Sequence, residues 1–159
     1  MMIIHSPQPW VKVNQCDDRY VEGNRAAWRA LEEACEIKPM VNQILLHISN
    51  TPLELVEFCQ KNDIAVEAYS PIAHGEILHQ PEIEAVGKKY GVSVPQLCIR
   101  YALQLGTIAL PKTANPAHME TNAQVTFEIG AEDMEMLKHF KHIENYGNSS
   151  GFPVYGGKL

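Results

Sequence analysis

The order of hydrophobic patterns constrains the fold of this chain more than any other feature. An apolar run of strand type, Val66 to Tyr69, lies between two helical patterns and breaks at Pro71. Such a run is typical of a buried parallel strand. Strand and helix patterns alternate four times along the chain. The sequence therefore predicts an α/β fold with one parallel sheet and right-handed crossovers.

The expected elements follow from these patterns and from the residues that bound them. Strands are expected at residues 1–5, 40–46, 66–69 and 107–111, and helices at 25–34, 51–61, 81–90, 93–105, 116–122 and 131–143. Helix caps are expected at Asn24, Thr51, Ser93 and Asn115. The length of 159 residues predicts a single domain, 1–159. Because the end of the chain is rich in Gly and Ser, we expect residues 144–159 to form a docked or free tail.

The charge balance argues against two classes of partner. The 159 residues include 13 Lys and Arg against 19 Asp and Glu, which gives a net charge of −6. A chain this acidic lacks the basic surface with which proteins bind nucleic acid or anionic membranes. We therefore expect neither partner, and a small anionic ligand would need a local basic site.

The cysteines and histidines favour a reduced, metal-free cytoplasmic protein. Four widely spaced cysteines form no CxxC pair, and the seven histidines form no HxxxH or HExxH pair. These spacings argue against a disulfide scaffold and a metal site. No run of 18 apolar residues and no signal-peptide pattern occurs, so we expect a cytoplasmic location.

The expected ends of the strands carry the candidate site residues. Tyr69 and Ser70 end one strand at the face where α/β proteins bind ligands, and a tyrosine ring there either stacks on a planar cofactor such as nicotinamide or packs structurally. His5 ends the first strand as a catalytic or a structural group. Trp10 follows in a long loop, as a pocket wall or a cover of the rim. Gln43 lies inside an expected buried strand, where its amide needs a ligand or a neighbouring strand or loop as partner.

Lys112 and Thr113 form the strongest chemical signal from spacing alone. They follow a short strand and directly precede a helix opened by Asn115 and Pro116. A lysine, a hydroxyl and the N–H groups of a helix start are the groups with which α/β folds hold phosphate. An ordinary solvated cap is the alternative. No GxGxxG or GxxxxGK motif occurs, so neither a dinucleotide-binding doubly wound fold nor a P-loop is supported.

Four motifs in order resemble a known enzyme family. They are Val41-Asn-Gln, Val66-Glu-Ala-Tyr-Ser-Pro, Tyr90-Gly-Val-Ser-Val-Pro-Gln-Leu-Cys-Ile-Arg, and Leu110-Pro-Lys-Thr followed by Asn115-Pro and Asn122. Together they closely resemble the C-terminal half of the aldo-keto reductases. The resemblance implies a partial (β/α)8 TIM barrel of about four parallel strands with flanking helices. It also implies reduction of small aldehydes and ketones with NADPH, or occasionally with NADH.

The resemblance also implies roles for individual residues. His5 resembles the active-site histidine that orients the substrate carbonyl. Gln43 resembles the glutamine that holds the nicotinamide amide, and Tyr69 resembles the ring that stacks on nicotinamide. The family further implies pyrophosphate contacts from Ser70 and Ile72, phosphate contacts on the adenosine side from Lys112 and Thr113, and adenine recognition by Asn122.

The departures from the family pattern matter for activity. The general-acid tyrosine of the family and its partner lysine and aspartate precede the strand of His5, so this chain lacks them. A strand-helix segment of the family is also missing between Ala34 and Cys35. His118 stands where the family usually has the arginine that pairs with the 2′-phosphate, and Thr121 replaces a usual glutamate. These replacements leave NADP(H) and NAD(H) as alternative cofactors.

Two functions remain open from the sequence. The first is an oxidoreductase of aldo-keto reductase type that is truncated and has little activity alone, because it lacks the general acid. The second is a non-catalytic nucleotide-binding module. Because a half-barrel leaves sheet edges uncovered, we expect this module to self-associate into a homo-oligomer.

Overall fold

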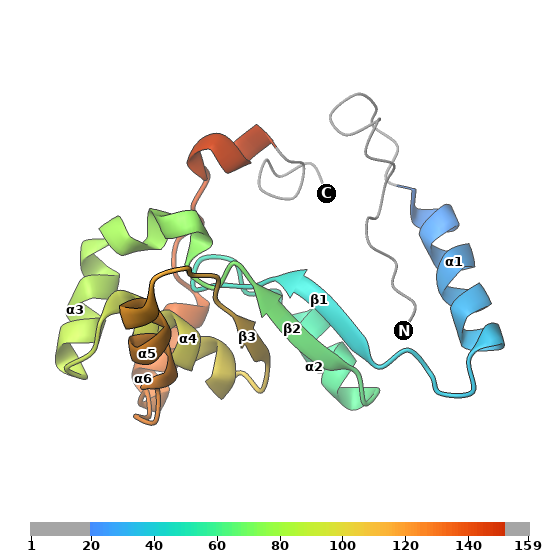
Figure 1. Cartoon of the computed structure of the whole chain (residues 1–159), viewed down its shortest axis with the longest axis horizontal. Helices are drawn as coiled ribbons and strands as arrows, with labels where there is room; N and C mark the ends of the chain where they lie inside the picture. Colours follow the sequence, from blue (N-terminus) through green and yellow to red (C-terminus); the bar gives the residue numbers. More distant parts are fainter. Residues whose placement is uncertain (1–19, 152–159) are drawn as a thin grey trace.

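A parallel sheet of three strands forms the centre of the computed structural model, which describes residues 20–151. The strands are β1 (Val41–Leu45), β2 (Ala65–Tyr69) and β3 (Ile108–Leu110), in the order β1-β2-β3. Figure 1 shows the three strands side by side with their helices. The alternation of strands and helices thus confirms the expected α/β class. The strand expected at residues 1–5 lies outside the described residues.

The helical elements connect and follow these strands. They are α1 (Val21–Ala34), α2 (Leu53–Lys61), the 3-10 segment η2 (Ala73–His79), α3 (Pro81–Lys89), α4 (Val94–Gln104), α5 (Pro116–Ala123), α6 (Ala131–Lys138) and the 3-10 segment η3 (Gly147–Gly151). The helix α2 lies between β1 and β2, and η2, α3 and α4 lie between β2 and β3. Each of these connections joins two parallel strands, as a parallel sheet requires.

One face of the sheet packs against the hydrophobic core. Val66 and Ala68 of β2 point to this face and are 2% and 0% exposed. Their register partners on β1 are Asn42 and Ile44. The core continues into α2, α3, α4, α6 and the segments around them, through Val56, Cys59, Ile77, Ile83, Leu97, Cys98, Tyr101, Met134 and Leu137. Burial of this face anchors the sheet to its helices.

The opposite face of the sheet is largely open. Successive side chains of a strand alternate between faces, so Val41 of β1 and Glu67 of β2 point to this side together with Ile108 and Leu110 of β3. The open side includes apolar residues, with Val41 47% exposed and Ile108 49% exposed. Only three strands are present within residues 20–151, so the outer edges of β1 and β3 pair with no further strand there.

Local sequence signals fix several helix ends as expected. Ser93 caps α4 in a capping box, since its side chain accepts the N–H of Gln96 and the Gln96 side chain accepts the N–H of Ser93. Asn115 caps α5 by accepting the N–H of Ala117 at 3.0 Å. Gly91 and Gly106 follow α3 and α4 with φ of 67° and 75°, a conformation that glycine adopts without a steric penalty.

Three expected boundaries are wrong. The helix α1 begins at Val21, after Tyr20 in a left-handed conformation, so Asn24 lies inside its first turn. Thr51 does not cap α2, because its hydroxyl donates to the carbonyl of His47 and lies 2.7 Å from the hydroxyl of Tyr101. The last helix, α6, ends at Lys138 rather than Ile143.

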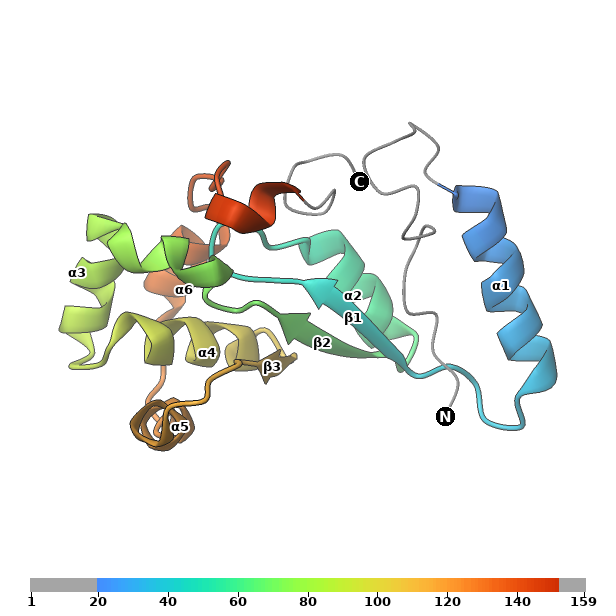
Figure 2. The same cartoon turned by 45° about the horizontal axis from the view of Figure 1, so that its top comes forward.

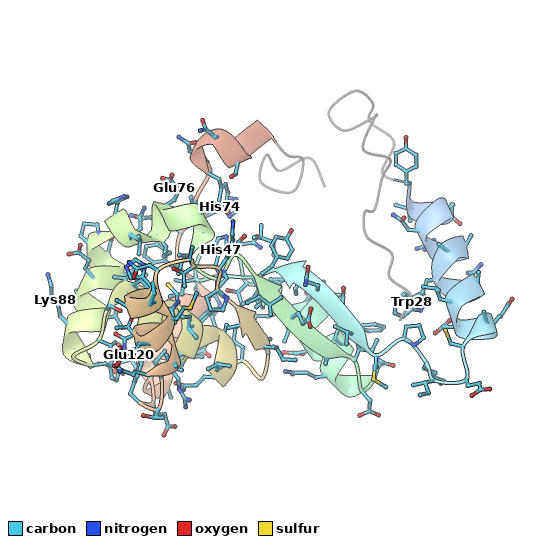
Figure 3. The ribbon with its side chains drawn as sticks, viewed as in Figure 1. Trp28, His47, His74, Glu76, Lys88 and Glu120 are labelled. Carbon is cyan, nitrogen blue, oxygen red and sulfur yellow. The ribbon has the colours of Figure 1, made fainter. Side chains whose placement is uncertain are left out.

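The helix α1 stands apart from the sheet and its helices in both views (Figures 1 and 2). None of its residues is buried, and Trp28 lies on this separate helix in Figure 3. None of the helices formed within residues 20–151 has the length and apolar content that crossing a bilayer requires.

Candidate functional site

Two of the expected site segments follow the carboxyl ends of neighbouring strands, and so leave the sheet on the same side. Tyr69 is the last residue of β2, and its register partner on β3 is Leu110. Because β2 and β3 are parallel neighbours, Ser70 and Lys112 follow adjacent strand ends on one side of the molecule. The carboxyl end of a parallel sheet is where α/β proteins bind ligands. The fold therefore brings together the two strand ends that the sequence singled out.

The turn after β2 has an unusual backbone. Ser70, Ala73 and His74 have φ values of 52°, 49° and 55°, in the left-handed region that residues other than glycine seldom adopt. The N–H of Ala73 donates to the carbonyl of Ser70 at 2.9 Å. Ile72 is half-buried and packs against the core. Ile72 thus anchors the turn, while Ser70 begins it.

The segment after β3 leads directly into α5. Lys112 is exposed and makes no hydrogen bond or ion pair with any residue between 20 and 151. Thr113 accepts the N–H of Asn115 through its hydroxyl at 3.1 Å. His118 and Asn122 lie four residues apart in α5, and side chains at this spacing share one face of a helix. A cation, a hydroxyl and a capped helix start therefore follow one strand end.

Gln43 occupies the open face rather than a buried position. It is exposed, and its Nε2 donates to Oε2 of Glu67 on β2 at 2.9 Å. The expectation that Gln43 sits inside a buried strand is wrong, because residues 20–151 leave this face of the sheet largely uncovered. Its neighbour Asn42 turns to the other face, where its amide lies 3.6 Å from Sγ of Cys59. Both amides thus find partners within the chain.

His5 and Trp10, the candidate catalytic and substrate-binding residues, lie outside the described residues. Sequence reasoning also missed Glu67, which contacts Gln43 on the open face. The alternation of β2 contained the signal, because Glu67 lies two residues before Tyr69 and must point to the same side of the sheet.

Sequence reasoning also missed a cluster of buried side chains around His47, which lies near the carboxyl ends of the strands. His47 follows β1 and is 1% exposed. Its Nε2 lies 3.1 Å from the hydroxyl of Tyr146, and its Nδ1 lies 3.3 Å from the hydroxyl of Ser49. Burial, together with a smaller contribution from the nearby His142 and His74, lowers the pKa of His47 to about 4. The ring is therefore neutral near pH 7.

His74 forms a second link at this end of the sheet. Its Nε2 lies 3.4 Å from the hydroxyl of Ser70, and its Nδ1 lies 3.2 Å from the hydroxyl of Ser149. Figure 3 shows His47, His74 and Glu76 near one another, between Lys88 on one side and Trp28 on the other. No local sequence pattern identifies the contact with Ser149, because the two residues are 75 positions apart in the chain.

Comparison with family models and with curated proteins identifies relatives of this chain. The aldo/keto reductase family model matches residues 19–142. An uncharacterized oxidoreductase of Schizosaccharomyces pombe is 41% identical over 108 residues, which are 67% of this chain and 39% of that protein. Glyoxal reductase of Bacillus subtilis is 34% identical over 113 residues, 70% of this chain and 41% of the reductase. The chain thus spans less than half the length of either relative.

Solved structures match the same part of the fold. A mutant of Gox0644 in complex with NADPH matches with a TM-score of 0.67 and 30% identity, over 74% of this chain and 44% of that one. An aldo-keto reductase in complex with NADPH matches with a TM-score of 0.66 and 28% identity, over 79% of this chain and 42% of that one. The parallel strands and flanking helices are accordingly part of a (β/α)8 barrel. The chain belongs to the aldo-keto reductase family.

Proposed function

We propose that the carboxyl ends of β2 and β3 bind the nicotinamide dinucleotide of a carbonyl reductase, with NADPH as the cofactor and NADH as the alternative. The observation that carries this proposal is the emergence of Ser70 and Lys112 from adjacent parallel strand ends. Two related structures that hold NADPH support it. The substrate would be a small aldehyde or ketone, to which the bound cofactor supplies a hydride.

The side chains at this site have the chemical groups that a dinucleotide requires. Lys112 is an exposed cation without a partner in residues 20–151, which suits a phosphate on the adenosine side. Thr113 adds a hydroxyl, and Asn122 on α5 adds an amide for adenine. For the nicotinamide end of the dinucleotide, Tyr69 offers a ring and Gln43 an amide, and Glu67 holds the Gln43 side chain. Ser70 and Ile72 would flank the pyrophosphate.

The isolated chain should have little reductase activity. In the family, a tyrosine donates the proton to the carbonyl oxygen, and no residue of this chain matches it. General acid catalysis contributes about 10² to 10⁴-fold to such reactions. His5 is proposed to orient the substrate carbonyl and Trp10 to border the substrate. Turnover of simple aldehydes with NADPH at the rate of a full-length reductase would contradict this expectation.

Binding measurements with a charge variant test the dinucleotide site. Titration of the chain with NADPH and NADH, followed by tryptophan fluorescence or calorimetry, should show saturable binding. Lys112→Met should raise the Kd for NADPH about tenfold, because a charge-assisted phosphate contact is lost. Lys61→Met is the matched control, since Lys61 ends α2 at the opposite end of β2. Equal NADPH affinities of the Lys112→Met and Lys61→Met variants would refute this assignment.

The same measurement addresses the choice between the two cofactors. His118 stands in the position where the family has an arginine for the 2′-phosphate, and it is exposed on α5. An imidazole offers a phosphate fewer hydrogen-bond donors and less charge than the guanidinium of arginine. His118→Arg should therefore increase the preference for NADPH over NADH, measured as the ratio of the two Kd values.

A second candidate function is a nucleotide-binding module without chemistry that self-associates. The observation that favours it is the open sheet face, where Val41 and Ile108 are about half exposed. Binding of NADPH without turnover, together with a homo-oligomer in solution, would distinguish this module from an enzyme.

A cytoplasmic location is also proposed. Its support is that Cys35, Cys59 and Cys98 are free thiols, as in a reducing compartment.

A further inference from the structure

Two histidines fasten the C-terminal segment, residues 142–151, to the ends of two strands. His47 follows β1, and its Nε2 lies 3.1 Å from the hydroxyl of Tyr146. His74 follows β2, and its Nδ1 lies 3.2 Å from the hydroxyl of Ser149. Tyr146 is only 2% exposed. This part of the expected tail is therefore docked.

Further contacts hold the same segment along its length. Ile143 donates its N–H to the hydroxyl of Ser49 at 3.3 Å, and Nδ1 of His142 lies 3.0 Å from the carbonyl oxygen of Ser49. At Gly147 an added Cβ would lie 3.6 Å from Oε1 of Glu76, which places η3 directly against η2. The segment thus contacts the loop after β1 and the 3-10 segment after β2.

The turn Ser70–Gly75, which leads from β2 into the start of η2, has a backbone that requires such support. Ser70, Ala73 and His74 all adopt left-handed backbone conformations. Conformations of this kind persist where surrounding contacts over-determine them. The core supplies one contact through Ala73, which is 0% exposed. The C-terminal segment supplies another, because His74 contacts Ser70 through Nε2 and Ser149 through Nδ1.

We infer that the docked segment 142–151 positions the Ser70–Gly75 turn for the pyrophosphate of the dinucleotide, with His47 and His74 as positioning residues. The inference rests on the proposed function. His74 connects the segment to Ser70, so displacement of Ser149 moves the group that holds the Ser70 hydroxyl. His47 acts one step further away by fixing Tyr146, three residues before Ser149 in the chain.

The protonation state of His47 supports this role. Burial holds the pKa of its imidazole at about 4, so the ring is neutral near pH 7. A neutral imidazole has one donor and one acceptor nitrogen. The hydroxyls of Tyr146 and Ser49 can satisfy both nitrogens, because a hydroxyl donates or accepts as required. The cluster can thus fix Tyr146 without burying a charge.

Two conservative variants remove the links separately. Tyr146→Phe keeps the ring and removes the hydroxyl that contacts His47. Ser149→Ala removes the hydroxyl that contacts His74. Tyr90→Phe is the matched control, because the Tyr90 hydroxyl also bonds other segments, Asp133 and the N–H of Gly130. Those contacts join α3 to α6, so the control loses a comparable hydroxyl but leaves the turn intact.

Two probes separate the turn from the rest of the site. Tyr146→Phe and Ser149→Ala should each raise the Kd for NADPH about three- to tenfold, as expected for the loss of one supporting hydrogen bond. They should leave the Kd for adenosine 2′,5′-bisphosphate unchanged, because this probe has no pyrophosphate. Tyr90→Phe should change neither value. NADPH affinities that are equal in the unchanged chain and in both variants would overturn the inference.

Amide hydrogen exchange of the ligand-free chain gives an independent readout. Tyr146→Phe should speed exchange in residues 70–79 and 142–151 while leaving α4 unchanged, and Tyr90→Phe should not affect residues 70–79. Unchanged exchange at residues 70–79 in Tyr146→Phe would overturn the inference. A chain that binds the bisphosphate but not NADPH would also overturn it. A chain that binds neither probe would instead refute the proposed function, and the dinucleotide role of the turn with it.

Discussion

His47 and Tyr146, 99 residues apart in the chain, meet through Nε2 and the phenolic hydroxyl at 3.1 Å. Their rings pack edge to face, with centroids 5.7 Å apart and an interplanar angle of 61°. This pair joins the end of β1 to the segment that follows α6. It therefore holds the C-terminal part of the described chain against the carboxyl end of β1, near the candidate site.

The first prediction concerns the pH dependence of stability. The pKa of His47 is about 4 in the folded chain, against 6.5 for an ordinary histidine. Between these values the unfolded state binds the proton more readily, so the free energy of unfolding should fall as pH decreases from 6.5 to 4. The full loss from this group is about 3 kcal/mol. Urea unfolding at several pH values in this range measures it.

A variant isolates this contribution from other titrating groups. The pKa values of Asp133 and Glu135 are lowered, mainly by hydrogen bonds from Lys89 and Lys138 respectively. The stabilisation of the fold that these carboxylates contribute is also lost in acid, when they become protonated. His47→Gln removes the imidazole but not these carboxylates. The variant should be less stable at pH 7 and should lose less stability between pH 6.5 and 4. An identical pH slope in both chains would contradict the assignment to His47.

The second prediction concerns two glycines with positive φ. At Gly91 an added Cβ meets nothing within 4 Å, so Gly91→Ala should cost about 1 kcal/mol through backbone strain alone. At Gly106 the Cβ would lie 2.8 Å from Nε2 of Gln60, which donates to the carbonyl of Leu105. Gly106→Ala should therefore cost about 2 kcal/mol, because strain and a lost hydrogen bond add.

Urea unfolding of both alanine variants measures this difference, with Gly91 serving as the control for strain. Equal losses at the two positions would show that Gln60 moves aside without a cost. Gly91→Asn should lose less stability than Gly91→Ala, since asparagine tolerates the left-handed region better than alanine does.

The third prediction concerns the open sheet face. If this face mediates self-association, sedimentation velocity should show an oligomer of the unchanged chain. Ile108→Lys should weaken association more than tenfold, because a charge would have to be buried in the contact. Folding should persist, since Ile108 is 49% exposed and pairs in register with Glu67. Met136→Lys on α6 is the control at another exposed apolar position.

A monomeric unchanged chain would contradict self-association. Equal weakening by the substitutions at Ile108 and Met136 would instead locate the contact elsewhere.

Residues near one another in the sequence determined much of the fold. The run Val66–Tyr69 predicts β2 because its apolar side chains and the break at Pro71 are local features. Ser93 and Gln96 predict the start of α4 for the same reason, since a capping box spans only four residues. Four short motifs, from Val41-Asn-Gln to Leu110-Pro-Lys-Thr with Asn115-Pro and Asn122, were also sufficient to indicate the family.

Only the tertiary structure decided which side chains meet and which face stays open. The expected cap at Thr51 is wrong, and its hydroxyl instead contacts the carbonyl of His47 and the hydroxyl of Tyr101, which is 50 residues away. Gln43 contacts Glu67 through strand register, and His47 contacts Tyr146 through the docking of the C-terminal segment. Hydrophobic periodicity and caps act over a few residues, so they determine elements and their ends. Partners distant in the chain are fixed by the pairing and packing of those elements, which no local pattern encodes.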